Sequence, residues 1–334
     1  MSRSSALDAV RILGIVAIVG GHTWALDSVA RWLYPWHVAV FFVLSGYLWS
    51  PGRSLGELAR RRARSLLVPY AVWLVLGGVV YLAARFRHGT FEVGFLRDAI
   101  FGGAYLSRPF SAFWFFPALF LAALMYWAVS RLPALAQGAV AVAVLALVAL
   151  LPGPLVALPF SIGQSLVGVV LMMAGRLAAA WPRQRWRGAR PWGGAIGAAA
   201  VVGGLALTVS GVVPWIDIRS LDLGIPVVSL AVGAAISVGL ILVAESVLTR
   251  PIGAISALAT TGTAVILGHA FILWPLYTPD TGSLRDFVLA LTVPWIVGFV
   301  AWWTPLAPYV LGVPRRTRAS APPREPERSL ARAS

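Results

Sequence analysis

The sequence predicts an all-α protein, a polytopic transmembrane bundle of about ten helices with both termini in the cytoplasm. Of its 334 residues, 59% are hydrophobic and only 12% are charged, and the mean hydropathy is +0.82. Soluble domains average about 25% charged residues, so most of this surface is expected to face lipid. The apolar runs also reach the roughly 20 residues that a helix needs to cross a bilayer.

Ten apolar segments divide the chain and are expected to form one membrane domain over residues 1–313. They are predicted at 8–26, 34–50, 66–84, 112–130, 133–151, 159–180, 192–213, 225–248, 254–277 and 286–308. The first segment lacks a small-residue cleavage site after a short apolar core, so we expect it to be retained. The last residues, 314–334, are rich in Arg, Pro, Ala and Ser and predict a disordered basic tail.

The connections between these segments fall into two sets of different charge. One set, together with both chain ends, holds 18 of the 27 basic residues, all arginine, and comprises 51–65, 131–132, 181–191 and 249–253. The other set holds seven arginines and comprises 27–33, 85–111, 152–158, 214–224 and 278–285. The positive-inside rule therefore predicts that the first set is cytoplasmic. Because this distribution marks membrane topology, the net charge of +15 does not indicate a nucleic-acid partner.

Missing residue types exclude several kinds of chemistry. The chain has no cysteine, which excludes disulfides, thiolate nucleophiles and thiolate metal ligands. Its four histidines are too scattered to predict a metal site. The sequence also lacks a phosphate-cradling glycine loop, so a nucleotide-bearing donor would have to be bound through arginines.

The first segment carries two ionisable side chains, Arg11 and His22. Eleven helical residues make three turns plus about 20°, so both side chains lie on one face, about 16 Å apart along the axis. Such groups are costly in hydrocarbon, and a functional site is the default hypothesis. The alternative is a pair buried for helix packing, with Arg11 held by Asp8 one turn earlier.

His22 is predicted to be catalytic. Burial among apolar residues favours a neutral imidazole, which can take a proton from an incoming hydroxyl. Its neighbours Gly20 and Gly21 leave room either for a substrate or for close helix packing. His269, in the ninth segment, is expected at a similar depth, where it either shares a cavity with His22 or bonds to a neighbouring helix.

Arg61 and Arg64 are candidates for binding an anionic ligand. They lie one helical turn apart just before the third segment, where they would clamp phosphates through paired N–H groups. The alternative is that they only mark topology.

Aromatic and small residues are candidates for a substrate pocket. Phe41 and Phe42 precede Ser45 and Gly46, and this arrangement would wall a cavity while another helix approaches closely. Trp114 begins the fourth segment at the membrane interface, where it is either a belt residue or part of a substrate platform.

Taken together, these residues resemble the membrane-bound acyltransferase 3 family of O-acyltransferases. The resemblance rests on Leu7-Asp8-Ala9-Val10-Arg11 through Gly21-His22, then Phe41-Phe42 with Ser45-Gly46, then Arg61 and Arg64 before Pro69-Tyr70. Trp114-Phe115-Phe116-Pro117 and Gly268-His269 are also similar to later segments of that family, in the same order.

The resemblance implies transfer of an acyl group, expected to be acetyl, from cytoplasmic acyl-CoA to a hydroxyl at the plasma membrane. Acyl-CoA would be a co-substrate, with no tightly bound cofactor. By position, His22 and Arg11 would be the essential pair and Arg61 and Arg64 would bind the donor. The acceptor would be an envelope carbohydrate or lipid-linked sugar, or else a lipophilic hydroxylated molecule such as a macrolide. The expected position of the histidines in the outer half of the membrane favours the envelope acceptor.

A transporter or flippase of a lipid-linked sugar is the alternative from a different class. The same polar stripe would then serve as a transport pathway. The chain shows no evident internal repeat, whereas many secondary transporters are built from inverted repeats.

Overall fold

The computed structural model describes residues 4–89, 94, 98, 101–102, 105–180 and 190–317. Over these residues the chain is all-helical, with one isolated bridge between Asp217 and Asp222 and no strand. Most of the predicted tail, 314–334, and parts of the connections at 85–111 and 181–191 lie outside the described residues. The disorder of that tail therefore stays a prediction.

All ten predicted apolar segments coincide with helices. These are α1 (Ser5–Thr23), α3 (Ala39–Tyr47), α5 (Val68–Arg87), α7 (Phe115–Val129), α8 (Ala134–Leu150), α10 (Ile162–Ala180), α12 (Arg190–Val209), α13 (Pro226–Val247), α14 (Gly253–Leu273) and α15 (Leu284–Trp302). Seven spans in the described residues are long and apolar enough to cross a membrane, one of them continuous over Leu55–Arg87. Because α3, α7 and α8 are shorter, the all-helical membrane fold is confirmed, while the count of ten spans stays a prediction.

Shorter elements occupy the connections. They are α2 (Asp27–Leu33), α4 (Leu55–Arg62), the π-helical turn η1 (Ala63–Leu67), α9 (Pro152–Val156), η3 (Pro159–Ser161) and α16 (Ala307–Val310). A capping box starts α4, because the Ser54 hydroxyl accepts from the Glu57 N–H and the Glu57 carboxylate accepts from the Ser54 N–H. Pro69, in the first turn of α5, has no N–H to donate to the preceding turn, and the helix widens there into η1.

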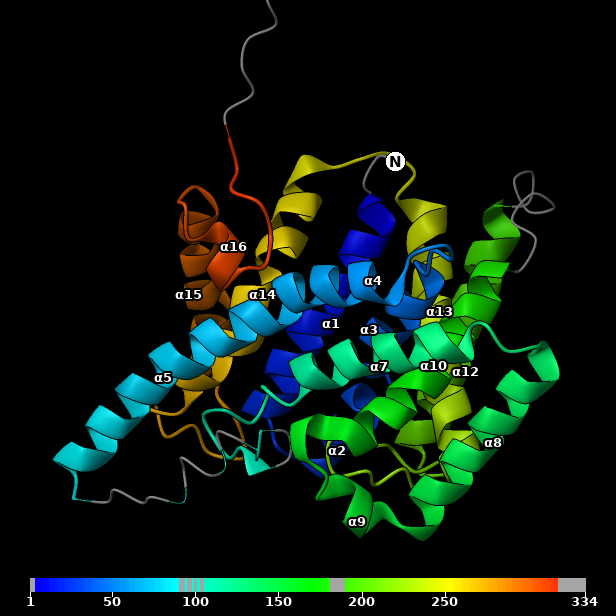
Figure 1. Cartoon of the computed structure of the whole chain (residues 1–334), viewed down its shortest axis with the longest axis horizontal. Helices are drawn as coiled ribbons and strands as arrows, with labels where there is room; N and C mark the ends of the chain where they lie inside the picture. The colour runs from blue at the N-terminus through cyan, green and yellow to red at the C-terminus, as the bar shows by residue number, and fades with distance from the viewer. Residues whose placement is uncertain are drawn as a thin grey trace, which may run out of the picture.

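α1 lies at the centre of the bundle (Figure 1). It packs against α14, α13 and α3, and α10 packs against α3 and α7. Glycines permit the closest approaches: a Cβ on Gly46 would collide with the Met172 carbonyl of α10, and one on Gly262 would collide with Ile15 of α1. The far end of α5 extends away from the other helices in Figure 1.

The two sets of connections gather at opposite ends of the bundle. At the end that holds most of the arginines, here the arginine-rich end, the Trp127 indole donates to the Arg53 carbonyl at 3.0 Å. At the other, the histidine end, the Tyr105 hydroxyl donates to the Ala157 carbonyl at 2.6 Å. In Figure 1 the N-terminus lies at the top, while α2 and α9 lie at the bottom. Which end faces the cytoplasm stays a prediction from the arginine distribution.

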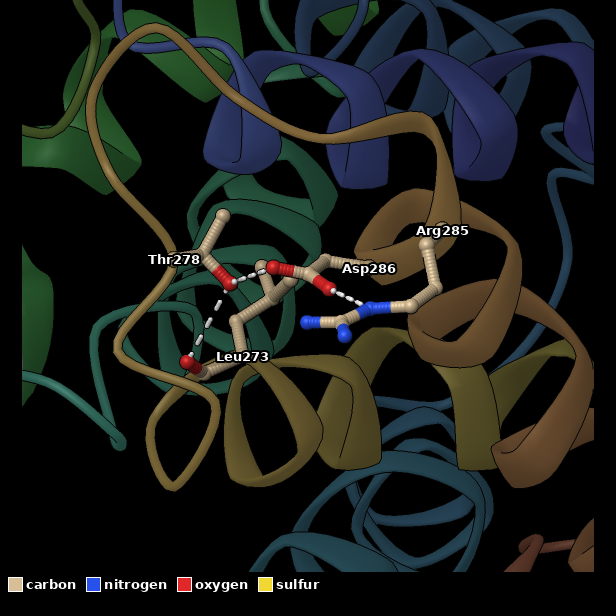
Figure 2. Close-up of polar contacts among 4 residues, drawn as sticks. All are labelled: Leu273, Thr278, Arg285 and Asp286. Atoms are coloured by element: carbon tan, nitrogen blue, oxygen red, sulfur yellow. Dashed lines mark hydrogen bonds and ion pairs between the residues drawn. The ribbon is translucent and has the colours of Figure 1, made fainter.

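A buried carboxylate fastens the connection after α14 at the histidine end (Figure 2). Asp286, in the first turn of α15, accepts hydrogen bonds from the Thr278 hydroxyl and from Arg285 Nε, each at 2.9 Å. Asp286 is 2% exposed, whereas the side chain of Arg285 is 72% exposed. The Thr278 hydroxyl also lies 3.4 Å from the Leu273 carbonyl. These contacts tie the end of α14, one turn beyond His269, to the start of α15.

Candidate active site

His22 and His269 lie in direct contact. Nδ1 of His22 is 2.7 Å from Nε2 of His269, and the ring centroids are 4.8 Å apart. The packing of α1 against α14 brings the two rings together, and Gly262 opposite Ile15 lets these helices approach closely. His269 is fully buried, whereas His22 is partly exposed. The structure therefore joins the two histidines that the sequence placed at similar depths.

The hydrogen bonds of the pair decide which nitrogen of each ring carries the proton. Nδ1 of His269 lies 2.9 Å from the Val265 carbonyl, which can only accept, so this nitrogen is the donor. In a neutral imidazole the other nitrogen is then the acceptor, so His22 Nδ1–H donates to His269 Nε2. The lone pair of His22 is left on Nε2. His269 thus prepares His22 to act as a base through that atom.

A cavity of about 90 Å³ lies beside His22 at the histidine end. Its polar and aromatic lining comes from α1, from the turn before α3, from the start of α7 and from the connection between α12 and α13. These lining residues are His22, Tyr34, His37, Trp114, Phe115, Asp217 and Arg219. Because His22 lines this cavity, a hydroxyl that enters it can approach the imidazole. Trp114, one of the predicted substrate residues, is therefore placed beside His22.

The connection over residues 214–224 forms one wall of this cavity and is held by several hydrogen bonds. The Asp217 carboxylate accepts from the Arg219 N–H at 3.0 Å and from the Ser220 hydroxyl at 2.8 Å. Arg219 in turn donates from Nη2 to the Leu106 carbonyl at 2.7 Å, and its own carbonyl accepts from Gln164 at 2.8 Å. Burial lowers the pKa of the Arg219 guanidinium from its ordinary value, while the neighbouring Asp217 opposes the shift. These hydrogen bonds hold the loop in place, and the loop brings the positively charged guanidinium of Arg219 to the cavity.

The paired glycines beside His22 serve helix packing. A Cβ on Gly21 would lie 3.2 Å from the Tyr34 ring, and one on Gly20 would lie 3.4 Å from Leu33. Of the two roles that the sequence allowed, the structure therefore favours close packing. This packing places Tyr34 next to the helix turn that carries His22, so the glycines shape the cavity indirectly.

Arg11 forms an ion pair with Asp8 on the same helix. Its Nη1 lies 2.6 Å from Asp8 Oδ1, and the two side chains are 32% and 0% exposed. The pair matches the interaction that the sequence offered as the structural alternative. Because Asp8 precedes Arg11 by one turn, it draws the guanidinium toward the arginine-rich end and away from His22.

The remaining predicted residues lie outside the cavity beside His22. Phe42, Ser45 and Gly46 are buried in α3, where Phe42 contacts Gly168 of α10. Phe41 packs edge-on against Phe115 with centroids 5.4 Å apart, so it contacts the cavity wall from behind. These positions serve the α3–α10 interface, and their role in a substrate pocket stays a prediction.

The predicted donor residues lie at the arginine-rich end. Arg61 and Arg64 are both exposed, whereas Arg62 between them is partly buried. Their role in donor binding also stays a prediction.

Sequence reasoning missed Tyr34, His37, Asp217 and Arg219 as cavity residues. His37 could have been found, because it is another ionisable residue inside an apolar segment. Its Nδ1 lies 2.9 Å from the Leu33 carbonyl, so its Nε2 is an acceptor when the ring is neutral. The two residues from the 214–224 connection gave no such signal, because only folding brings that loop over α1.

Comparison with known proteins identifies the chain at the level of family. A family model described as "Acyltransferase domain" matches residues 4–313, nearly the whole chain. It is the family that the sequence motifs resemble, so that expectation is confirmed. No significant match was found among curated proteins or solved structures.

Proposed function

The chain belongs to the acyltransferase 3 family, and from this premise we propose that it is an O-acyltransferase using acyl-CoA as donor. Membership makes it an acyltransferase with membrane-spanning helices. The observation that carries the finer proposal is the hydrogen-bonded His22–His269 pair, which leaves the His22 Nε2 lone pair as a base beside a cavity.

In the proposed reaction, His22 is the general base. Its Nε2 takes the proton of the acceptor hydroxyl while the hydroxyl oxygen forms a bond to the thioester carbonyl carbon. The carbon–sulfur bond then breaks, and the imidazolium returns the proton to the departing thiolate. The products are an ester and CoA, so atoms and charge balance. His269 accepts the Nδ1–H of His22 throughout and holds the ring in this tautomer.

Arg11 is proposed to hold the donor on its way to His22. The two residues are 11 positions apart on α1, about 16 Å of helix rise, and the Asp8 ion pair turns the guanidinium away from His22. This geometry favours donor binding over polarising the carbonyl at the reacting carbon. Arg61 and Arg64 at the same end would add contacts to the donor phosphates.

The acceptor is proposed to be a hydroxyl of an envelope carbohydrate or lipid-linked sugar. The cavity beside His22 combines aromatic walls from Trp114 and Phe115 with polar groups from Tyr34 and His37, a lining that suits a polyhydroxylated ring. It lies at the end predicted to face outward. A macrolide-like acceptor that enters from the bilayer is the competing acceptor, and the assay below separates the two.

The test is release of CoA from acetyl-CoA by the purified protein. Because the chain contains no cysteine, a thiol reagent reports released CoA without background from the protein. We expect thiol release only when an acceptor is added, either isolated envelope polysaccharide or a macrolide. CoA release with the polysaccharide but not with the macrolide supports the envelope acceptor. CoA release with the macrolide but not with the polysaccharide overturns the envelope acceptor.

The control is the same protein with His22→Gln, which keeps a polar side chain but cannot serve as the base. A transporter would release no CoA under any of these conditions. The acyltransferase proposal would be contradicted if the parent protein released no CoA with either acceptor and transported a lipid-linked sugar in vesicles.

A further inference from the structure

A second cavity, of about 180 Å³, lies at the arginine-rich end between the end of α3, the helix α4 and the end of α7. Three arginines line it: Arg53, Arg62 and Arg131. Arg53 and Arg131 are exposed and Arg62 is partly buried, so the cavity runs inward from the surface. Among the described residues, no aspartate or glutamate lines it. We call it the arginine cavity.

The positive charges around this cavity are not neutralised from within. The charges of Arg61, Arg11 and Arg53 all act unfavourably on the Arg62 guanidinium. Within the described part of the chain, neither Arg53 nor Arg62 has a side-chain hydrogen bond or ion pair to an acceptor. Glu57, the nearest acid along the sequence, is used in the capping box of α4. Like charges held this close are stabilised when an anion lies between them.

One residue of the cavity wall carries a buried donor. Trp49 lines the cavity, and its Nε1 is buried without a hydrogen-bond partner among the described residues. Its ring is fixed edge-on against Tyr126, with centroids 4.8 Å apart. A buried N–H without an acceptor is unfavourable, and such groups are rare in folded proteins.

Arg131 is already oriented for binding. Its guanidinium lies over the Trp127 ring, 3.3 Å from the centroid, and Nη1 donates to the Trp127 carbonyl at 2.7 Å. Nη2 lies 3.4 Å from the Arg53 carbonyl. These contacts fix the plane of the guanidinium and leave further N–H groups available, since arginine has five. Less entropy is lost when a fork fixed in this way meets a ligand.

We infer that the arginine cavity binds a phosphate ester. Guanidinium groups fit the several acceptor oxygens of a phosphate, and the volume of the cavity suits such a group. Two sources share this chemistry: the nucleotide portion of the donor, which rests on the proposed function, and the headgroup of an anionic phospholipid.

The test measures binding, not turnover, on the purified full chain in phosphate-free buffer. Coenzyme A and adenosine 3′,5′-bisphosphate are titrated by calorimetry, and retained phosphatidylglycerol is counted by native mass spectrometry from mixed phosphatidylcholine nanodiscs. We expect Arg53→Gln and Arg62→Gln each to raise the dissociation constant, or reduce lipid retention, by about tenfold or more. Trp49→Phe removes the N–H together with the five-membered ring of the indole and is expected to weaken binding by about two- to tenfold.

Arg250→Gln is the matched control, because Arg250 is an exposed arginine at the same end and does not line the cavity. It should bind the probes as the parent does. Arg53→Lys and Arg62→Lys keep the charge and guard against loss of folding. Footprinting of the unmodified protein with phenylglyoxal needs no variant: the bound probe should protect Arg53 and Arg131 but not Arg250.

Each outcome decides the inference. Nucleotide binding that depends on the cavity residues supports it with the donor as source. Cavity-dependent retention of phosphatidylglycerol without nucleotide binding also supports it, and at the same time contradicts acyl-CoA as donor. The inference is wrong if the cavity variants bind the probes as tightly as Arg250→Gln does, and if the probes protect Arg53 and Arg131 from phenylglyoxal no more than Arg250. This holds even if the protein proves to be an active acyltransferase.

Discussion

The two cavities at opposite ends of the bundle are built in opposite ways. At the histidine end, two consecutive hydrogen bonds link the Val265 carbonyl to His269 and His269 to His22. At the arginine-rich end, donors outnumber acceptors: three guanidinium groups and the Trp49 indole line one cavity that has no acidic lining residue in the described chain. The first arrangement fixes a reactive atom, which suits chemistry. The second leaves its donors for a ligand, which suits binding.

The largest effect expected concerns which end faces the cytoplasm, since this decides from which side each substrate arrives. Gly153 and Gly253 are exposed glycines at the histidine end and the arginine-rich end, and a Cβ added at either meets nothing within 4 Å. In this cysteine-free chain, an impermeant maleimide should label Gly153→Cys in intact cells and Gly253→Cys only after lysis. The reverse pattern would exchange the assigned sides of donor and acceptor.

Replacing His22 should produce the next largest effect. His22→Ala and His22→Gln should lower turnover by about 10²- to 10⁴-fold, the contribution of a general base. Binding of coenzyme A at the arginine-rich end should stay within a factor of about two, since the two cavities are at opposite ends. The measurement is thiol release beside calorimetry on the same preparation. Turnover near that of the parent in both variants would remove His22 from the mechanism and leave the histidine pair as packing.

His269 should have a smaller effect, through the orientation of His22. His269→Phe removes the acceptor for the His22 Nδ1–H and leaves a buried donor unsatisfied, which costs about 1–3 kcal/mol. If that cost appears in the transition state, turnover falls about 5- to 150-fold, mostly in kcat.

His269→Gln is the matched control for this effect, because its amide oxygen can accept the same hydrogen bond. It should recover most of the lost turnover, and the parent's pH profile should be retained. Equal loss in the Phe and Gln variants would show that His269 contributes volume and not an acceptor.

Sequence reasoning predicted the parts of this molecule that depend on composition and on single helices. The helical membrane fold and the family follow from apolar periodicity and from the motifs around Arg11 and His22, and both are confirmed. The Asp8–Arg11 pair was foreseeable because both residues lie on one helix, one turn apart.

Contacts between segments that are distant in the chain could not be predicted from the sequence. Whether His22 and His269 touch depends on how α1 and α14 pack, and glycine–side chain approaches such as Gly262 on Ile15 decide that. The Arg219 loop and the arginine cavity depend on loops folding back over helix ends, for which periodicity carries no information. The contact between Tyr47 of α3 and Glu245 of α13 also depends on helix packing, and there Glu245 accepts a hydrogen bond from the Tyr47 hydroxyl at 2.8 Å.

The smallest expected effect tests whether the hydrogen bonds to the buried Asp286 carboxylate stabilise the histidine end. Thr278→Val keeps the side-chain shape but removes a hydrogen bond to the buried Asp286 carboxylate, worth about 1.5–3 kcal/mol of folding stability. Arg285→Gln removes a charge whose side chain is 72% exposed, so solvent screening should limit its contribution to about 0–1 kcal/mol. Thermal unfolding in detergent should therefore place the Tm of Thr278→Val below that of Arg285→Gln.

This order follows from burial and not from formal charge, because the two bonds to Asp286 have the same length of 2.9 Å. A partly buried neutral hydroxyl bonded to the buried carboxylate then counts for more than a guanidinium at the surface. The Thr278→Val variant should also lower turnover by only a few-fold, since it loosens α14 one turn beyond His269 while the His22–His269 bond remains. A larger fall in Tm for Arg285→Gln would mean that charge, and not the buried hydroxyl contact, fastens this end of the bundle.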